Sequence, residues 1–255
     1  MMAASNFEFK QRFAIIGGIF GLAFASYSID HQTAGAAATD WIARVRGTVA
    51  TAADYRLMFA LAGLLCVLAA LIRTWATAYL NAEVMMGAHV QTSRLVADGP
   101  YRYVRNPLYL GNILLALGFG LMASRIGFFI LVLGMWLFCC RLILREEASI
   151  AASQGESYRS YCAAVPRLLP ALRPKLPSAE AVPNWGDGIL GEAFMWVLAA
   201  SVVAFAVTLN QIVYFWVLGS SFVVYAVCFA IIKIRRKPAA GDASEAAGNS
   251  AKPGI

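Results

Sequence analysis

The chain has 255 residues, of which 60% are hydrophobic and only 14% are charged. Because soluble domains carry roughly 25% charged residues, this composition excludes an ordinary soluble enzyme and indicates that lipid surrounds much of the protein. The net charge of +7 does not predict nucleic-acid binding, since the positions of the cations matter more than their sum in a membrane protein. The five cysteines lack a Cys-x-x-Cys spacing and there are only two histidines, so we expect neither disulfides nor a metal site.

Six apolar runs follow one another along the chain, and each is long enough, or nearly so, for a helical span of ~20 residues. We expect the first run to be a retained span and not a cleaved signal peptide, because Ser26-Tyr27-Ser28 is a poor cleavage site. Only Arg125 separates the third run from the fourth, which predicts a central helical hairpin. The last two runs meet in a tight turn at Asn210-Gln211. The runs are Phe13–Ile29, Leu57–Ile72, Leu108–Ser124, Ile126–Cys140, Ala193–Leu209 and Ile212–Ile232.

The segments between these runs predict polar or interfacial elements. Asp40 is a candidate N-cap of a short helix lying on the membrane surface. Arg73 marks the wet end of the second span, where its long side chain can reach the head groups. The fourth helix is expected to continue through Arg145 into water and to stop near Gly155. The apolar face of the interfacial helix would consist of Trp41, Val45 and Val49.

These elements predict an all-α integral membrane protein of about six transmembrane helices with a cofactor pocket on the cytoplasmic side. We divide the chain into four regions. The regions are residues 1–90, with two spans and the interfacial helix; 91–175, with the hairpin and most of the unusual polar residues; 176–237, with the second hairpin; and 238–255, a tail expected to be disordered.

The lysines and arginines predict the orientation of the spans. With both termini in the cytoplasm, the cytoplasmic segments hold 17 of the 21 Lys and Arg residues. This bias favours six spans and, with the Ala-rich composition, a bacterial inner membrane. It also places residues 81–107 and 141–188 on the same side. The cations of the opposite side are Arg44, Arg46, Arg56 and Arg125.

Residues 99–111 form the first cluster with possible chemistry. Pro107 suits the first turn of the third span, which makes Asn106 a candidate N-cap. A helix N-terminus attracts anions, and Arg105 beside it can bind the same carboxylate or phosphate. The alternative is a simple anchor for lipid head groups. Gly111 and Gly118 lie on one helix face and would let another helix approach closely.

The second cluster lies at the end of the fourth helix. Glu146 and Glu147 point about 100° apart, so one can bind a ligand while the other pairs with an arginine. Arg141 and Arg145 repel each other unless something anionic lies between them. A solvated helix extension is the alternative interpretation. The order and spacing of both clusters together are more specific than either cluster alone.

Residues 94–170 resemble the isoprenylcysteine carboxyl methyltransferase and phospholipid methyltransferase group of membrane enzymes. The matching residues are Leu95-Val96-Ala97-Asp98-Gly99-Pro100-Tyr101, Arg105-Asn106-Pro107-Leu108-Tyr109-Leu110-Gly111, Glu146-Glu147, Gly155, Tyr158, Tyr161 and Val165-Pro166-Arg167. Asn106 stands where the family usually has His, and Asn cannot titrate near neutral pH, so an acid or base role is not expected there.

The resemblance implies S-adenosylmethionine as methyl donor and an acceptor that enters from the bilayer. It implies catalytic roles for Arg105 and Glu147. The implied cofactor-binding residues are Gly99, Tyr101, Arg105, Asn106, Pro107, Tyr109, Gly111, Arg145, Glu146, Glu147 and Tyr158.

The acceptor itself cannot be read from the sequence. We expect a lipophilic or lipid-attached carboxylate or amine as partner, together with membrane lipids and no nucleic acid. Two alternatives stay open: a nicotinamide-dependent membrane reductase of related scaffold, and a non-enzymatic lipid-binding membrane protein.

Overall fold

A computed structural model describes residues 2–80 and 97–235, and side chains as far as residue 231. The regular elements of these described residues are helices, and an isolated β-bridge between Thr33 and Ser124 is their sole β pairing. The tight turn at Asn210-Gln211 is confirmed, since one helix ends at Thr208 and the next begins at Gln211. The long fourth helix is also confirmed, since it ends at Gln154 with Gly155 as its C-cap. The elements are α1 (Asn6–Lys10), α2 (Arg12–Ala25), η1 (Ser26–Ser28), α3 (Ala34–Val45), α4 (Ala52–Tyr79), η2 (Gly99–Arg102), α6 (Pro107–Met122), α7 (Arg125–Gln154), α8 (Glu156–Ala164), α9 (Trp185–Thr208) and α10 (Gln211–Arg235).

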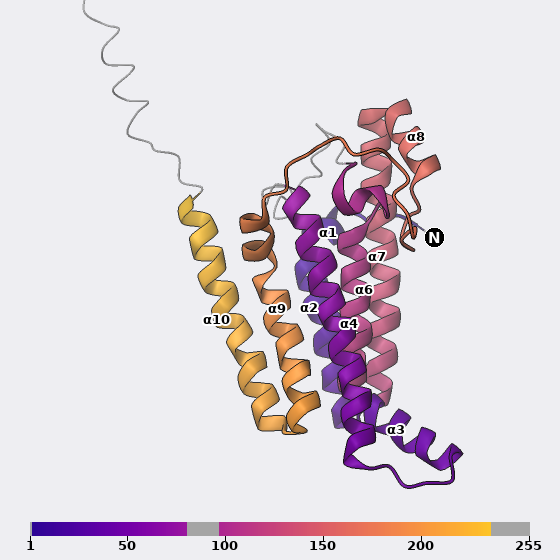
Figure 1. Cartoon of the computed structure of the whole chain (residues 1–255), viewed down its shortest axis with the longest axis vertical. Coiled ribbons are helices and arrows are strands. Elements are labelled where there is room, and N and C mark those ends of the chain that lie inside the picture. The colour runs from indigo at the N-terminus through magenta and orange to yellow at the C-terminus, as the bar shows by residue number, and fades with distance from the viewer. Residues whose placement is uncertain (1, 81–96, 236–255) are drawn as a thin grey trace, which may run out of the picture.

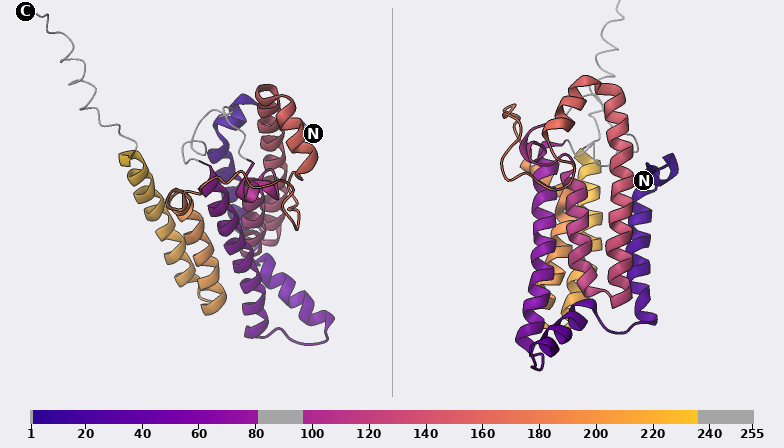
Figure 2. Two further views of the ribbon diagram at one scale, coloured as in Figure 1. Left: turned by 45° about the horizontal axis from the view of Figure 1, so that its top comes forward. Right: turned by 90° about the vertical axis from the view of Figure 1, so that its right-hand side faces the viewer.

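Helix α4 is the centre of the helix bundle, packing against α9 on one side and α6 on the other. Helix α7 lies between α6 and α2, and α10 packs on α9 at the outer edge (Figures 1 and 2). Small residues permit the close approach to α6. A Cβ added to Gly118 would lie 2.6 Å from the Ala62 carbonyl oxygen, and one added to Gly111 would lie 2.4 Å from Cγ of Arg73. The packing role expected for these two glycines is confirmed.

Four of the described helices, α4, α7, α9 and α10, are long and apolar enough to cross a membrane. Helices α2 and α6 are also apolar, but they have only 14 and 16 residues. Many large apolar side chains of the long helices are exposed, such as Leu133 of α7 and Phe215 of α10. Because such a surface is stable in hydrocarbon and not in water, the chain is an integral membrane protein.

The expectations for the interfacial helix were partly wrong. Thr33 is the N-cap of α3, because its hydroxyl accepts from the Ala36 amide at 3.0 Å. Asp40 lies inside the helix, where its carboxylate accepts a hydrogen bond from Gln32 at 2.9 Å. Helix α3 ends at Val45, so Val49 belongs to the following loop. The predicted apolar side chains are nevertheless exposed, as an interfacial helix requires.

The two ends of the bundle differ in what they carry. The N-terminus, α8 and the last turn of α10 lie at one end, whereas α3 and the turn between α9 and α10 lie at the other (Figure 1). The expected tail at 238–255, His89 and the matching residues Leu95-Val96 lie outside the described residues. The four-region division stays a prediction.

Candidate active site

Asp98 anchors the segment that enters the first cluster. Its carboxylate accepts hydrogen bonds from the amides of Gly99 at 2.8 Å and of Ala179 and Ala181 at 3.0 Å each, and from the Ser178 hydroxyl. These donors, led by the Ala181 amide, hold the pKa of Asp98 below its ordinary value. Asp98 therefore fastens η2 to a chain segment that lies about eighty residues later in the sequence.

Residues 165–181, which we call the strap, run across η2 and the residues that follow it. The Arg105 amide donates to the Pro166 carbonyl at 2.9 Å, and the Ala171 amide donates to the Tyr103 carbonyl at 2.9 Å. The Lys175 amide donates to the Arg102 carbonyl, also at 2.9 Å. Backbone contacts thus fix the strap against the first cluster before any side chain is considered.

Glu147 joins the two clusters. Its Oε1 accepts from the side-chain amide of Asn106 at 3.0 Å and lies 3.3 Å from Nε of Arg105. Its Oε2 lies 2.8 Å from the guanidinium of Arg167, which belongs to the strap. Glu147 and Arg105 are each only 10% exposed as side chains, whereas Arg167 is 51% exposed. We call Arg105, Asn106, Glu147 and Arg167 the Glu147 cluster.

The adjacent carboxylate has a different environment. The Tyr109 hydroxyl of α6 donates to Glu146 at 2.7 Å. Glu147 thus pairs with arginines, as expected of one of the two glutamates, whereas Glu146 accepts from a tyrosine and lies within the electrostatic reach of Arg12. Ligand binding by the other glutamate stays a prediction. Asn106 is the N-cap residue of α6, but its side chain does not cap the helix because it donates to Glu147 and to the Arg167 carbonyl at 3.1 Å. The first-turn amides of α6 thus receive no side-chain cap.

Three tyrosines pack beside the Glu147 cluster. Tyr158 and Tyr161 of α8 are buried with their ring centroids 5.9 Å apart, and the Tyr161 hydroxyl donates to the Tyr101 carbonyl at 2.8 Å. The Tyr101 hydroxyl is buried and has no hydrogen-bond partner within the described part of the chain. Burial raises the pKa of Tyr101 well above its ordinary value, so the phenol stays protonated. A buried hydroxyl without a partner is a group that a ligand can satisfy.

Residues 57–156 match a family model described as phospholipid methyltransferase. A similar curated protein is the protein-S-isoprenylcysteine O-methyltransferase of Schizosaccharomyces pombe, which is 33% identical over 106 residues. The match covers 37% of this chain and 45% of that relative, so the chain spans less than half of the relative's length. No solved structure matches the chain.

The region that matches the family model, residues 57–156, contains most of the predicted site, but not all of the residues around Glu147. Arg105, Asn106, Glu146 and Glu147 lie within it and converge as expected. Tyr158 and Arg167 lie beyond it, on α8 and on the strap. Arg167 was quoted in the resemblance, yet it was not among the predicted site residues. Arg167 follows Tyr161-Cys162-Ala163-Ala164 by three residues, and this spacing did not show that the strap folds back to reach Glu147.

Arg145 does not join the Glu147 cluster. Its guanidinium donates to the Ala4 carbonyl at 3.1 Å and to the Asn6 side chain, and it lies over the Phe9 ring. One turn earlier, Arg141 pairs with Glu8 at 2.8 Å. The N-terminal segment thus supplies the anion and acceptors that the two arginines require, which the sequence patterns did not predict. A cofactor role for Arg145 has no support from this geometry.

Two glycines of the predicted site are explained by packing. Gly99 has a positive φ of 56°, and a Cβ there would lie 2.5 Å from the Tyr79 ring. Gly111 faces the Arg73 side chain, as described above. Pro107 begins α6 and is buried. The cofactor-binding role of these residues stays a prediction.

Helix α4, which lies mostly within the matched region, is also joined to α9 by an ion pair that the sequence patterns missed. Arg73, expected to reach the head groups, instead points into the bundle, where its Nε lies 2.7 Å from Glu192. Glu192 is 1% exposed and also accepts from the Thr77 hydroxyl at 2.8 Å. Arg73 further donates to Asn112 at 2.9 Å. We call these four residues the Glu192 cluster. An acidic residue directly before the fifth apolar run was the available signal.

Proposed function

We propose that this protein transfers a methyl group from S-adenosylmethionine to a lipid-like or lipid-attached acceptor. The observation that carries the proposal is the convergence of the two sequence clusters on Glu147, at one end of the bundle. The family of residues 57–156 and the similarity to an isoprenylcysteine O-methyltransferase support the reaction type. They favour it over the nicotinamide-dependent reductase and the non-enzymatic alternative.

The groups of the site suit such a donor, which carries a carboxylate, an ammonium and a sulfonium. Arg167 has half of its side chain in solvent, so it can bind the carboxylate together with the first-turn amides of α6. Arg105 is a weaker candidate for that contact, because it is buried between Glu147 and the Cys162 carbonyl at 3.0 Å. We assign Arg105 to the positioning of Glu147. The Tyr101 hydroxyl offers one further hydrogen bond.

Glu147 is the group best placed to bind the cationic part of the donor or a ribose hydroxyl. Its Oε1 is held by Arg105 and Asn106, whereas its Oε2 is held by Arg167, the more exposed partner. Arg167 can turn away from Glu147 when a group of the ligand takes its place, because about half of the arginine side chain is already in solvent while the carboxylate stays paired. Oε2 would then accept a hydrogen bond from the ligand while Oε1 stays fixed.

The reaction demands alignment more than acid–base catalysis. Bound S-adenosylmethionine would supply an electrophilic methyl group, and the chain must hold an acceptor in line with it. Asn106 fits this requirement, since it fixes Glu147 by a hydrogen bond and does not titrate. A carboxylate acceptor needs no base. An amine acceptor would release a proton that Glu146, which accepts from the Tyr109 hydroxyl, can take up.

We further propose that the two short apolar helices also cross the membrane, which gives six spans with the Glu147 cluster and both termini on the cytoplasmic side. Helices α2 and α6 run alongside the longer helices of the bundle (Figures 1 and 2). The bias of 17 to 4 in lysine and arginine supports this orientation. The acceptor would then approach the cluster from the inner leaflet.

Equilibrium binding of S-adenosylhomocysteine to the purified full-length protein tests the proposal. We expect Glu147→Gln and Arg167→Ala to weaken binding by roughly ten- to a hundredfold, because each removes a charged hydrogen bond. Arg159→Ala is the matched control: this arginine of α8 is 75% exposed and, within the described part of the chain, its salt bridge is to Glu156. It should bind as the unaltered protein does.

Two outcomes would contradict the proposal. One is the absence of binding by the unaltered protein, which favours the non-enzymatic alternative. The other is saturable binding of NADPH that Glu147→Gln weakens, which favours the reductase. Incubation of membranes with methyl-labelled donor, followed by lipid extraction, then identifies the fraction that carries the acceptor.

A further inference from the structure

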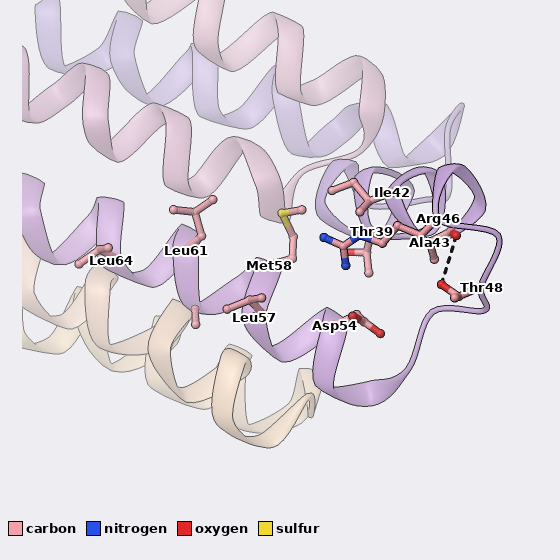
Figure 3. Close-up of a pocket in the computed structure, with 11 residues that line it drawn as sticks. Thr39, Ile42, Ala43, Arg46, Thr48, Asp54, Leu57, Met58, Leu61 and Leu64 are labelled. Carbon is pink, nitrogen blue, oxygen red and sulfur yellow. Dashed lines mark hydrogen bonds between the residues drawn. The ribbon is translucent and has the colours of Figure 1, made fainter.

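A cavity of about 450 Å³ lies between α3 and α4, at the end of the bundle opposite to the Glu147 cluster. Figure 3 shows the wall that α4 contributes: Leu57, Leu61 and Leu64 follow one another along one face of the helix. All three leucines are exposed, by 73%, 49% and 53% respectively. They continue from the cavity along a helix that is long and apolar enough to cross the membrane. The part of the cavity that these leucines line is therefore open to acyl chains.

The other part of the cavity carries charge. Arg46 is the C-cap residue of α3, and Asp54 lies in the first turn of α4, on the facing wall (Figure 3). Arg46 makes no salt bridge with any residue that the structure describes, in residues 2–80 and 97–235. Asp54 accepts from the Thr51 amide at 2.8 Å as part of a capping box, which fixes its carboxylate in place. Arg46 and Asp54 thus line the same cavity as the three leucines, which form its apolar groove.

We propose that this groove binds a zwitterionic phospholipid with an amine in its head group, in the leaflet opposite to the Glu147 cluster. The phosphate pairs with Arg46, the ammonium pairs with Asp54, and one acyl chain lies along the three leucines. This occupant accounts for both charges, since an anionic lipid would leave Asp54 facing a second negative group. It also accounts for the apolar lining, which water would not fill favourably. The assignment depends on the membrane insertion of α4 and not on methyl transfer.

Photocrosslinking in reconstituted vesicles tests the assignment. The full-length protein is placed in phosphatidylglycerol vesicles that contain a small fraction of phosphatidylethanolamine with a diazirine on the acyl chain, and crosslinked peptides are mapped by mass spectrometry. We expect crosslinks at residues 57–64 that a phosphatidylglycerol probe in the same vesicles gives at about a tenth of the yield. Unlabelled phosphatidylethanolamine should compete.

Variants separate this groove from general lipid contact. Arg46→Ala removes the phosphate contact and Leu61→Trp fills the groove, so each should reduce crosslinking about tenfold. Arg44→Ala and Leu68→Trp are the matched controls, because both residues are exposed on the same helices and neither lines the cavity. Glu147→Gln should leave crosslinking at 57–64 unchanged.

Asp54→Asn keeps an acceptor for the Thr51 amide but loses the charge, so it should abolish the preference for phosphatidylethanolamine over phosphatidylglycerol. Equal crosslinking of both probes by the unaltered protein would overturn the proposal. So would equal losses in the matched controls, which would show only general exposure to lipid.

Discussion

Glu147 and Glu192 are both buried carboxylates bound by arginine, yet their surroundings differ. The Glu192 cluster is enclosed by α4, α6 and α9, and its arginine is only 12% exposed. The Glu147 cluster lies at the end of the bundle, and one of its arginines comes from the strap and is 51% exposed. Removing a charge from water is costly, so each cluster needs complete pairing. Only the Glu147 cluster can exchange a partner with solvent, which fits a site for ligands.

The largest expected effect is a loss of stability on mutation of the Glu192 cluster. Glu192→Ala leaves Arg73 buried without its counter-ion, so we expect the free energy of unfolding to fall by about 3–5 kcal/mol, measured by denaturant unfolding in detergent. The double variant Arg73→Met/Glu192→Leu removes both charges and should recover most of this loss. If Glu192→Ala unfolds like the unaltered protein, the two clusters do not differ as described.

The next effect tests the open cluster. Asn106→Asp keeps the size of the side chain but places a second carboxylate where Glu147 now receives a hydrogen bond at 3.0 Å. Repulsion should displace Glu147, and we expect methyl transfer to fall about hundredfold in kcat/KM. The change in unfolding free energy should be smaller than that of Glu192→Ala. A fully active Asn106→Asp variant would show that Glu147 needs no positioning.

A smaller effect is expected at the anchor of the strap. Asp98→Asn removes the charge that binds the amides of Gly99, Ala179 and Ala181. Because the strap carries Arg167, we expect methyl transfer to fall about tenfold. Hydrogen exchange of the amides at 179–181 should accelerate in this variant. Unchanged exchange with reduced activity would mean that Asp98 acts by some route other than the strap.

The smallest effect concerns the N-terminal segment. The hydrogen bond from Arg141 is the main cause that lowers the pKa of Glu8 from 4.5 to about 2. A carboxylate with a lowered pKa contributes its pairing fully above about 4.5 and loses it as the pH falls toward about 2. The methyl NMR resonance of Ala4, which packs with Phe9, should therefore shift across this range. Glu8→Gln should show no such transition.

Hydropathy and end signals predicted much of the helical scaffold. Gly155 ended the fourth helix and Pro107 began the third span as expected, because both residues act through local backbone geometry. The assignment of Asp40 as an N-cap was wrong because Thr33, seven residues earlier, offers the same chemistry. Local signals of this kind locate a helix but do not choose between neighbouring caps.

The pairing of distant side chains was harder to predict. The sequence indicated that Arg105 and Glu147 act together, since the family resemblance gave their relation. It gave no reason to pair Arg73 with Glu192 or Arg141 with Glu8, because these partners lie more than a hundred residues apart and depend on how the helices pack. Sequence patterns reveal which charges are unusual, whereas tertiary packing decides what neutralises them.

The Glu147 cluster is built from two parts of the chain, the helix bundle and the strap. Residues 57–156 hold the fixed side of the carboxylate, and Arg167 comes from a stretch outside that match. Insertions or replacements in the strap can therefore reshape the entrance while the bundle keeps its packing. In such an arrangement, substitutions in one surface segment can change which molecules reach the Glu147 cluster, without the loss of stability that changes among the buried helices would bring.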